Sequence, residues 1–280
     1  MTSFSIVTIV YNDVTHIKET MESVINQSYK NIEYILVDGK SNDGTKEAIL
    51  ELITSCATIT LEDQKEDRFY LEATHNTYPT LTFKFLSEKD KGIYDAMNKG
   101  IALTTKEWIN FMNCGDRFYN LNVIREISKD NIKKYDVIYG DTEIIYNSQN
   151  KKIIKKTTNP KYRMPFSHQS VFTKTQIQKL HPFDLSFKIC SDNDFFTKIY
   201  NNKKVFHKIP IVIASCLSGG ISSVSTFRYI YEEYKIGLKY NKFFIFYFIP
   251  TLATELLKFI VKKILPNCFL HSIQARYNAK

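Results

Sequence analysis

Two short apolar runs near the N-terminus, each followed by polar residues, place the strongest constraint on the fold of this chain. Residues 5–11 are rich in β-branched side chains, and residues 33–37 form a second run of the same kind. Such runs are typical of strands that are buried on both faces of a sheet. Between them, Ile17, Met21 and Val24 recur at helical spacing. The alternation of strand and helix predicts parallel βαβ units in an open α/β sheet.

The continuation of this sheet is predicted from shorter signals. Residues 80–85 alternate like a strand, whereas the polar stretch before them fits either a hairpin or a disordered insertion. Thr15 is the expected N-cap of the first helix. Further helices are expected over 90–101 and 121–127, and further strands over 108–112 and 136–139. The predicted architecture is an open, mostly parallel sheet flanked by helices.

The C-terminal region differs from the rest of the chain in charge and aromatic content. The protein has 280 residues and a net charge of +9, and residues 224–280 hold nine basic and three acidic side chains. An aromatic run over 243–249 and scattered lysines favour a helical tail that lies on an anionic membrane surface, rather than one that binds nucleic acid. The run is too short and too charged for a spanning helix. We therefore expect one domain over 1–222 and a basic, aromatic-rich tail over 223–280.

The cysteines and the N-terminus bear on the compartment. Five cysteines form no CxxC pair, and the chain enters its first strand without a basic and apolar leader. Both features favour reduced thiols in the cytoplasm. Together with the tail, they predict a protein that is peripheral on the inner face of the cytoplasmic membrane.

Polar residues follow three of the predicted strands. They are Tyr11, Asn12 and Asp13 after the first, Asp38, Gly39, Ser41 and Asp43 after the second, and Asn113, Gly115 and Asp116 after a later one. In open α/β sheets, ligands bind in the crevice at the carboxyl ends of the strands. Turns also favour Asn, Asp and Gly without any function, so each group taken alone fits an ordinary turn.

The order and spacing of several motifs extend this pattern. They are Val37-Asp38-Gly39-Lys40-Ser41-Asn42-Asp43-Gly44-Thr45, the segment Ser87 to Ile101, Met112-Asn113-Cys114-Gly115-Asp116, Ser167-His168-Gln169, Ser191-Asp192-Asn193-Asp194 and Gly219-Gly220-Ile221-Ser222. Over about residues 4–222 the chain resembles the family-2 inverting glycosyltransferases of bacteria, which have the GT-A fold. The segment from Asp90 to Ile101 looks closest to the members that assemble capsules, O-antigens and related polysaccharides.

The resemblance implies a set of donor-binding residues. Asp38 looks like the carboxylate that reads the uracil base, and Tyr11 and Asn12 would lie against the nucleoside. The remaining donor-side positions are Asp90, Asp95, Asn98, Asn113 and Gly115. Asp95 fits an ordinary solvated helix acid equally well.

The resemblance also implies a metal ligand and a general base. Asp116 occupies the family's metal-binding acidic motif and would hold Mn²⁺ or Mg²⁺, although many relatives carry two or three acids there. Asp192 aligns with the catalytic acid of the family's Glu-Asp motif, with Ser191 in place of the Glu. An acid at a helix N-terminus is also a common cap, and Asp194 competes for the role of base. The acceptor or phosphate side would be formed by His168, Gln169, Asp194, Gly219 and Gly220.

The function implied is the transfer of one sugar from a nucleotide-sugar donor, expected to be a UDP-sugar, to a lipid-linked or growing glycan acceptor. Two other classes remain open on the sequence alone. A sugar nucleotidyltransferase uses a similar crevice, but it would carry a Gly-rich phosphate loop with a basic residue near the N-terminus, and Tyr11-Asn12-Asp13 offers neither. A non-catalytic nucleotide-binding scaffold would fit the reduced acidic motif.

Overall fold

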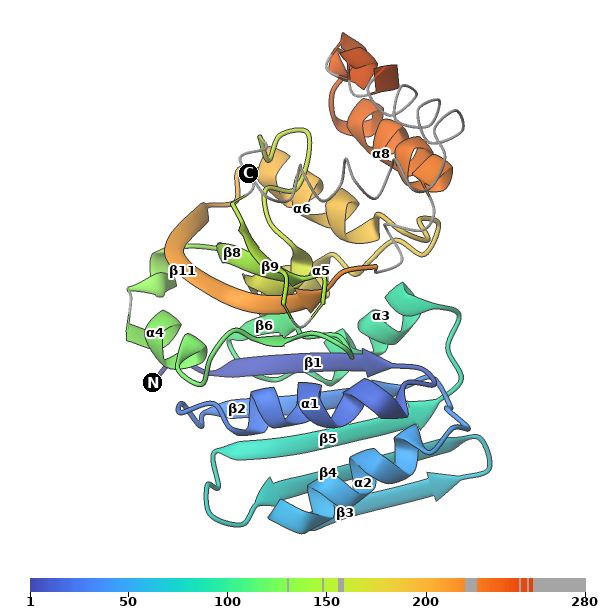
Figure 1. Ribbon diagram of the computed structural model, residues 1–280, viewed down its shortest axis with the longest axis vertical. Coiled ribbons are helices and arrows are strands. Elements are labelled where there is room, and N and C mark those ends of the chain that lie inside the picture. Colours follow the sequence, from blue (N-terminus) through green and yellow to red (C-terminus); the bar gives the residue numbers. More distant parts are fainter. Residues whose placement is uncertain are drawn as a thin grey trace.

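The centre of the structure is a parallel sheet (Figure 1). The computed structural model describes residues 1–129, 131–147, 149–155, 159–219, 226–246, 248–250 and 252–253. Strands β1 (Phe4–Val10) and β2 (Ile32–Asp38) are parallel neighbours, with β5 (Leu81–Glu88) beyond β2 and β6 (Trp108–Phe111) beyond β1. All seven residues of β1 and of β2 are buried, which confirms that these strands are covered on both faces.

Antiparallel pairs occur on both sides of this centre, although β8 and β11 pair in parallel, so the sheet is mixed rather than mostly parallel. At one end, β3 (Ala57–Lys65) and β4 (Arg68–His75) form a hairpin that pairs with β5. The stretch before residue 80 is therefore a hairpin and not a disordered insertion. At the other end lie β10 (Val171–Lys174), β8 (Val137–Ile145), β11 (Phe206–Leu217), β7 (Arg117–Phe118) and β9 (Lys151–Ile154).

Helices cover the two faces of the sheet and bury two apolar cores. Helices α1 (Val14–Ile25), α2 (Thr45–Cys56) and α4 (Val123–Lys129) pack on one face. Helices α3 (Ile93–Leu103), α5 (Thr175–Leu180) and α6 (Ser191–Asn201) pack on the other. In β1, Phe4 and Ile6 face the first core, whereas Val7 and Ile9 face the second. This alternation follows from the two-residue period of a strand, and it confirms the α/β class.

The N-cap of the first helix lies two residues earlier in the chain than the sequence predicted. Asp13, not Thr15, is its N-cap, because the Asp13 carboxylate accepts a hydrogen bond from the His16 N–H at 3.3 Å. Asp and Thr are both common caps, so the choice depends on where the chain leaves β1. The residues after Val10 turn at Asn12, whose φ is +49°, and this turn brings Asp13 to the helix start.

The described part of the tail is a helix that packs on the domain. Helix α8 (Thr226–Tyr240) contacts α6, and its Ile236 is buried with Phe187 and Cys190. Residues 223–225 and 254–280 of the predicted tail lie outside the described residues. None of the helices in the described part of the chain combines the length and the apolar character that a bilayer crossing requires.

Candidate functional site

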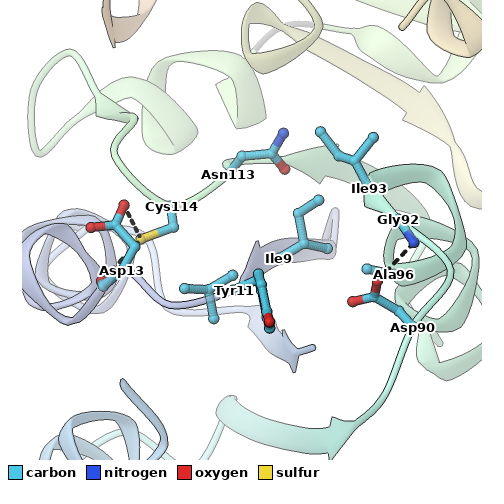
Figure 2. A pocket seen from close by; sticks show the side chains of 10 residues that line it. Ile9, Tyr11, Asp13, Asp90, Gly92, Ile93, Ala96, Asn113 and Cys114 are labelled. Carbon is cyan, nitrogen blue, oxygen red and sulfur yellow. Dashed lines mark hydrogen bonds between the residues drawn. The ribbon is translucent and has the colours of Figure 1, made fainter. Parts of the chain in front are cut away.

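A cavity of about 380 Å³ opens at the carboxyl ends of β1 and β6, beside the start of α3. Its lining is formed by Ile9, Val10, Tyr11, Asp13, Asp90, Gly92, Ile93, Ala96, Asn113 and Cys114. Figure 2 shows Asp13 and Cys114 on one side and Asp90 and Gly92 on the opposite side, with Ile9 and Tyr11 between them. Three residues predicted for the donor side, Tyr11, Asp90 and Asn113, thus line one cavity.

Gly39 allows the carboxylate of Asp90 to lie against the end of the sheet. A Cβ atom on Gly39 would stand 2.5 Å from Asp90 Oδ2 and 3.1 Å from the Tyr11 ring. Asp90 Oδ1 accepts the N–H of Gly92 at 2.8 Å, and the φ of Gly92 is +114°, a conformation that favours glycine. Gly39 was not among the predicted site residues, although its place directly after a buried strand was the available signal.

Asp38 is buried at the end of β2 and does not line the cavity. Its side chain is fully buried, and its oxygens accept hydrogen bonds from the hydroxyls of Ser41 at 2.5 Å and Ser87 at 2.6 Å. Asn12 holds the same loop, since its N–H donates to Ser41 Oγ and its Oδ1 accepts the Asn42 N–H. Neither Asp38 nor Asn12 lines the cavity.

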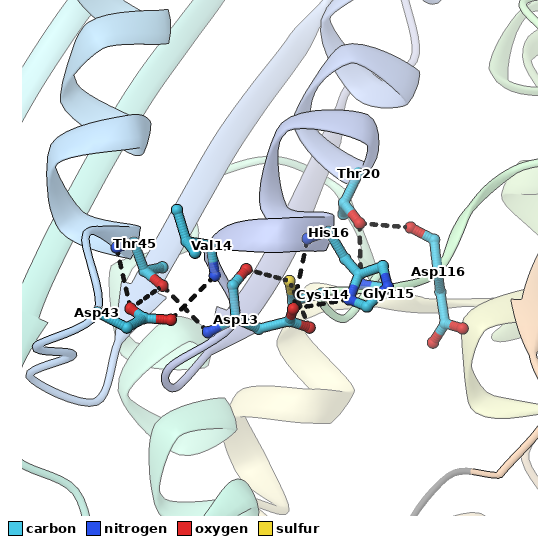
Figure 3. Close-up of polar contacts among 9 residues, drawn as sticks. All are labelled: Asp13, Val14, His16, Thr20, Asp43, Thr45, Cys114, Gly115 and Asp116. Atoms are coloured by element: carbon cyan, nitrogen blue, oxygen red, sulfur yellow. Dashed lines mark hydrogen bonds and ion pairs between the residues drawn. The ribbon is translucent and has the colours of Figure 1, made fainter.

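Asp13 and Cys114 form a side of the cavity, although neither residue was assigned a role there from the sequence. The Cys114 thiol donates to Asp13 Oδ2 at 3.4 Å, and Asp13 Oδ1 lies 2.7 Å from His16 Nδ1 (Figure 3). Burial, followed by the negative charge of Asp13, raises the pKa of the thiol, so Cys114 stays protonated. The Asp13 N–H donates to Thr45 Oγ1, whose hydroxyl donates to Asp43. These bonds tie the end of β1 to the start of α2.

The turn after β6 places Asp116. Gly115 has a φ of +91°, and its N–H donates to Thr20 Oγ1, which donates in turn to the backbone oxygen of Asp116 (Figure 3). The positive φ, rather than a close approach, accounts for the glycine, because an added Cβ would meet its nearest neighbour at 3.6 Å. The Asp116 carboxylate is 9% exposed and accepts from Gln169 Nε2 at 2.6 Å. Burial raises its pKa despite this bond.

The residues near Asp116 fit a cation that shares its coordination with substrate phosphates. Among the described residues, no cluster of three or more His, Cys, Asp or Glu side chains forms a metal cage. Within the same residues, the buried Oδ1 of Asn113 has no hydrogen-bond partner, and the buried carboxylate of Asp116 accepts from Gln169 and from the Leu217 N–H. Mg²⁺ and Mn²⁺ commonly bind through one or two carboxylates plus phosphate oxygens, for which this sparse set of oxygens suffices.

Asp192 lies in the first turn of α6 and is 8% exposed. Its Oδ1 is 3.0 Å from the Tyr94 hydroxyl and accepts the Asn193 N–H at 2.8 Å, while its Oδ2 is 3.4 Å from His168 Nδ1. Burial by itself would raise the pKa of Asp192, but the hydrogen bond and charge of His168, with help from Asn193 and Tyr94, bring it below the usual value. Asp192 is therefore a carboxylate at neutral pH.

Two consecutive residues, His168 and Gln169, connect the predicted metal ligand with the predicted base. His168 Nε2 lies 2.9 Å from Asn113 Nδ2, and its Nδ1 faces Asp192. If the Asn113 amide donates, His168 carries its proton on Nδ1 and donates it to Asp192. Gln169 meanwhile donates to Asp116. Asn113, which lines the cavity, thus contacts His168, which faces Asp192, and the adjacent Gln169 contacts Asp116.

Other predicted residues have different surroundings. Asp95 accepts the Lys91 N–H at 2.9 Å, and the amide of Asn98 binds the backbone of Phe183, so neither lines the cavity. Asp194 faces α8, where it accepts from Lys239 and Tyr240. Gly219 has a φ of +100° with open space around it. Gly220 lies outside the described residues.

The family follows from a comparison with family models. The model of Glycosyl transferase family 2 matches residues 5–191. The chain belongs to this family. It is a glycosyltransferase by that membership, and the matched range includes the cavity, Asp116, His168 and Gln169 and ends one residue before Asp192. The resemblance predicted from the motifs is thereby confirmed at the level of the family.

Curated relatives come from glycoconjugate and polysaccharide biosynthesis. The PGL/p-HBAD biosynthesis glycosyltransferase of Mycobacterium tuberculosis is 23% identical over 238 residues, which cover 79% of each protein. The amylovoran biosynthesis glycosyltransferase AmsB of Erwinia amylovora is 28% identical over 159 residues, or 54% of this chain and 45% of AmsB.

Solved structures share the fold. S. aureus TarS 1-349 superposes with a TM-score of 0.59 at 17% identity, over 85% of this chain and 66% of that one, so this chain spans slightly less than two thirds of it. TarS 1-349 has also been solved with UDP-GlcNAc. The mannosyltransferase PcManGT from Pyrobaculum calidifontis, in complex with GDP-Man and Mn²⁺, gives a TM-score of 0.57 at 15% identity, over 99% of this chain and 80% of that one. At these identities the likeness concerns the GT-A fold alone.

Proposed function

We propose that the protein is an inverting glycosyltransferase that moves a sugar from a UDP-sugar to a lipid-linked or growing glycan in surface polysaccharide assembly. The observation that carries the proposal is the pairing of His168 with Asp192 and of Gln169 with Asp116. Through two adjacent residues it connects a buried carboxylate suited to a cation with an ionised carboxylate suited to a base, and His168 also contacts Asn113 of the cavity. The relatives from PGL/p-HBAD and amylovoran biosynthesis support the class of product.

The cavity suits the nucleotide part of the donor. Its floor is apolar, from Ile9, Val10, Ile93 and Ala96, and the ring of Tyr11 is 66% exposed at its edge. An exposed ring offers a surface for stacking on a base. The carboxylates of Asp13 and Asp90 lie on opposite sides, where they can accept hydrogen bonds from donor hydroxyl or imide groups. Asp38 supports the cavity in this proposal by holding the neighbouring loop.

The charge of the cavity supports a metal-dependent donor site. The residues that line it include two carboxylates and no Lys or Arg. A diphosphate placed there needs a positive partner, and a Mn²⁺ or Mg²⁺ ion held by Asp116 and Asn113 would stabilise the negative charge on the leaving diphosphate. The same lack of basic residues disfavours a nucleotidyltransferase, which needs cationic side chains around a triphosphate.

Asp192 is the proposed general base. Each carboxylate oxygen can accept about two hydrogen bonds, and Oδ1 faces two donors while Oδ2 faces His168 alone. Oδ2 therefore has a lone pair for the proton of the acceptor hydroxyl. As that proton moves to Asp192, the acceptor oxygen forms a bond to the anomeric carbon. The bond from this carbon to the diphosphate oxygen breaks, and its electron pair leaves with the nucleoside diphosphate. One displacement from the opposite side inverts the configuration.

The described tail supports an acceptor carried in a membrane. Five apolar side chains in the described part of the tail are more than half exposed, namely Phe227, Tyr231, Phe243, Phe246 and Ile249. Lys235 and Lys242 are close to them in sequence. Aromatic side chains with nearby lysines suit the surface of an anionic bilayer. We propose peripheral binding to the cytoplasmic face, where a polyprenyl-linked acceptor would be presented.

Donor binding and turnover test the proposed function. Thermal unfolding is measured with UDP, GDP and CDP, each with and without Mn²⁺, and we expect UDP with Mn²⁺ to raise Tm most because it binds the native state. Release of UDP from a panel of UDP-sugars is then followed with lipid-linked oligosaccharide acceptors. A protein whose Tm responds to none of the nucleotides and that releases no diphosphate would be a scaffold, contrary to the proposal.

Vesicle binding tests the membrane part of the proposal. We expect the full chain to sediment with vesicles that contain anionic lipid, and the double variant Phe243→Ser with Phe246→Ser to bind at least fivefold less. The matched control is Leu180→Ser, which alters a 74% exposed leucine on α5. Equal sedimentation of the Phe243→Ser/Phe246→Ser variant and the wild type would show that the described tail is not the anchor.

A further inference from the structure

Helix α8 carries a buried carboxylate that hydrogen-bonds to the backbone just before α6. Glu232 is 4% exposed, and its Oε1 accepts the N–H of Lys188 at 3.0 Å. Its Oε2 accepts the N–H groups of Ile189 at 2.9 Å and Cys190 at 3.0 Å. Cys190 is the N-cap residue of α6 and offers no side-chain cap of its own. One side chain of the tail therefore binds three successive backbone groups that lead into this helix.

The segment 188–190, which Glu232 binds, is connected with Asp192 through the side chain of Tyr94. The hydroxyl of Tyr94 lies 2.6 Å from the backbone oxygen of Ile189 and 3.0 Å from Asp192 Oδ1. The peptide groups around Ile189 are thus held on one side by Glu232 and on the other by Tyr94. Asp192 follows Ile189 by three residues, so the direction of its side chain depends on how this segment is fixed.

A second set of contacts docks α8 independently of Glu232. Asp194 accepts from Lys239 Nζ at 2.9 Å and from the Tyr240 hydroxyl at 2.9 Å. Glu233 pairs with Arg163 at 2.6 Å. These contacts do not involve Glu232. The helix can therefore stay docked when the hydrogen bonds of Glu232 to residues 188–190 are weakened. Asp194 is committed to this contact, which leaves Asp192 as the acid that faces His168.

We propose that Glu232 is a positioning residue that sets the geometry of Asp192 from the C-terminal tail. The inference rests on the proposed function of Asp192 and extends it, because it makes the tail a part of the catalytic site as well as a membrane segment. A carboxylate bound to several N–H groups gives strong, charge-assisted hydrogen bonds in a site with little water. Small misplacement of a reacting group can lower turnover by about 100-fold.

The variant Glu232→Gln tests this role with little change of shape. Its amide keeps one acceptor oxygen and turns the other into a donor that faces N–H groups. We expect kcat to fall about 10- to 100-fold while the KM for the donor changes less than twofold, because the donor cavity does not include the segment 188–190. Glu51→Gln, the same change at an exposed helix position on α2, is the control and should retain wild-type kcat.

A double variant separates positioning from general damage. In the Asp192→Asn background, Glu232→Gln should cause no further loss, because its effect acts through Asp192. An equal fold-loss in both backgrounds, or a kcat within twofold of Glu51→Gln, overturns the inference. Loss of the proposed function itself looks different: the wild type would then release no nucleoside diphosphate, or Asp192→Asn would keep full activity.

Hydrogen exchange gives a readout that needs no activity. We expect the amides of residues 188–190 to exchange at least tenfold faster in Glu232→Gln than in the wild type, with amides of β1 and β2 unchanged. Unchanged exchange at residues 188–190 would contradict the proposed role of the Glu232 hydrogen bonds, whether or not the protein shows activity.

Discussion

Two acid-containing regions of this protein are held in opposite ways. In the loop after β2, Asp38 is bound by Ser41, three residues away, and by Ser87 on the neighbouring strand β5. In the segment before and within the start of α6, the partners come from distant parts of the chain: Tyr94 and His168 bind Asp192, and Glu232 binds the backbone at 188–190. The first region is closed by hydroxyl groups of its own loop and of the neighbouring strand, and the second forms only when α3, α6 and α8 meet.

This difference predicts that the loop after β2 contributes mainly to stability and the segment around α6 mainly to turnover. The acid at the loop after β2 has its oxygens occupied by hydroxyl donors, so it contributes to the fold. Asp192 keeps one lone pair available, and Asp116 is buried with its charge incompletely balanced. Substitutions in the segment around α6 should therefore reduce turnover with little loss of stability, and substitutions in the loop should do the reverse. Four experiments test this separation.

The largest effect is expected for Asp192→Asn. An amide cannot accept the acceptor proton, and general bases contribute about 100- to 10,000-fold, so kcat should fall by about 1,000-fold with Tm little changed. Steady-state release of UDP measures it. Asp194→Asn is the matched comparison, two residues away in the same helix, and should lose less than about tenfold. If the two variants lose the same activity, Asp194 shares or holds the role of base.

Metal removal is expected to be nearly as damaging. EDTA should lower wild-type turnover at least about 100-fold, because the ion offsets several kcal/mol of developing charge, and added Mn²⁺ should restore it. Asp116→Asn should show a similar loss without restoration. Turnover that is unaffected by EDTA would remove the metal from the mechanism.

A smaller effect with a distinct pH signature is expected for His168→Ala. His168 is the main group that opposes the effect of burial on Asp192, with Tyr94 and Asn193 as weaker partners, so its loss should raise the pKa of Asp192. The base is then protonated at higher pH, and the acidic limb of the kcat profile moves to higher pH. Turnover at neutral pH should fall about tenfold. His181→Ala, on a residue outside this network, should leave the profile unchanged; an unshifted limb in His168→Ala would contradict the assignment.

The smallest effect on turnover is expected for Ser41→Ala. It removes the 2.5 Å bond to Asp38 and the acceptor for the Asn12 N–H. Bonds to a charged, buried group contribute about 1.5–3 kcal/mol, so the free energy of unfolding should fall by about 2 kcal/mol with kcat within twofold. Urea unfolding measures it against Ser55→Ala, an exposed serine on α2. A large rise in donor KM instead would return Asp38 to the donor site.

The parts of the fold that could be predicted are those that short-range sequence patterns indicate. The buried runs 5–11 and 33–37 and the helical spacing of Ile17 and Met21 correspond to β1, β2 and α1. The hairpin of β3 and β4 was ambiguous because β3 is an edge strand whose side chains are mostly exposed, which weakens its period-two pattern. The sheet is less parallel than expected because pairing partners such as β10 and β6 are distant in sequence.

The site was predicted in its residue types but less well in its contacts. Tyr11, Asp90 and Asn113 line the cavity as expected, because the ends of parallel strands meet at one edge. Asp13 and Gly39 were predicted to lie at this edge but were given no role, and Cys114 was given none either, since each fits an ordinary turn residue. No local signal could pair Glu232 with Lys188, because the bond joins residues 44 positions apart.

Because of that separation along the chain, residues 188–190 are synthesised well before Glu232. When Cys190 is added to the growing chain, the carboxylate that will bind its N–H is still 42 residues from being made. At about 5–20 residues per second, the nascent sheet waits roughly 2 to 9 seconds for this partner. During that interval the N–H groups of residues 188–190 lack the carboxylate that binds them in the folded protein.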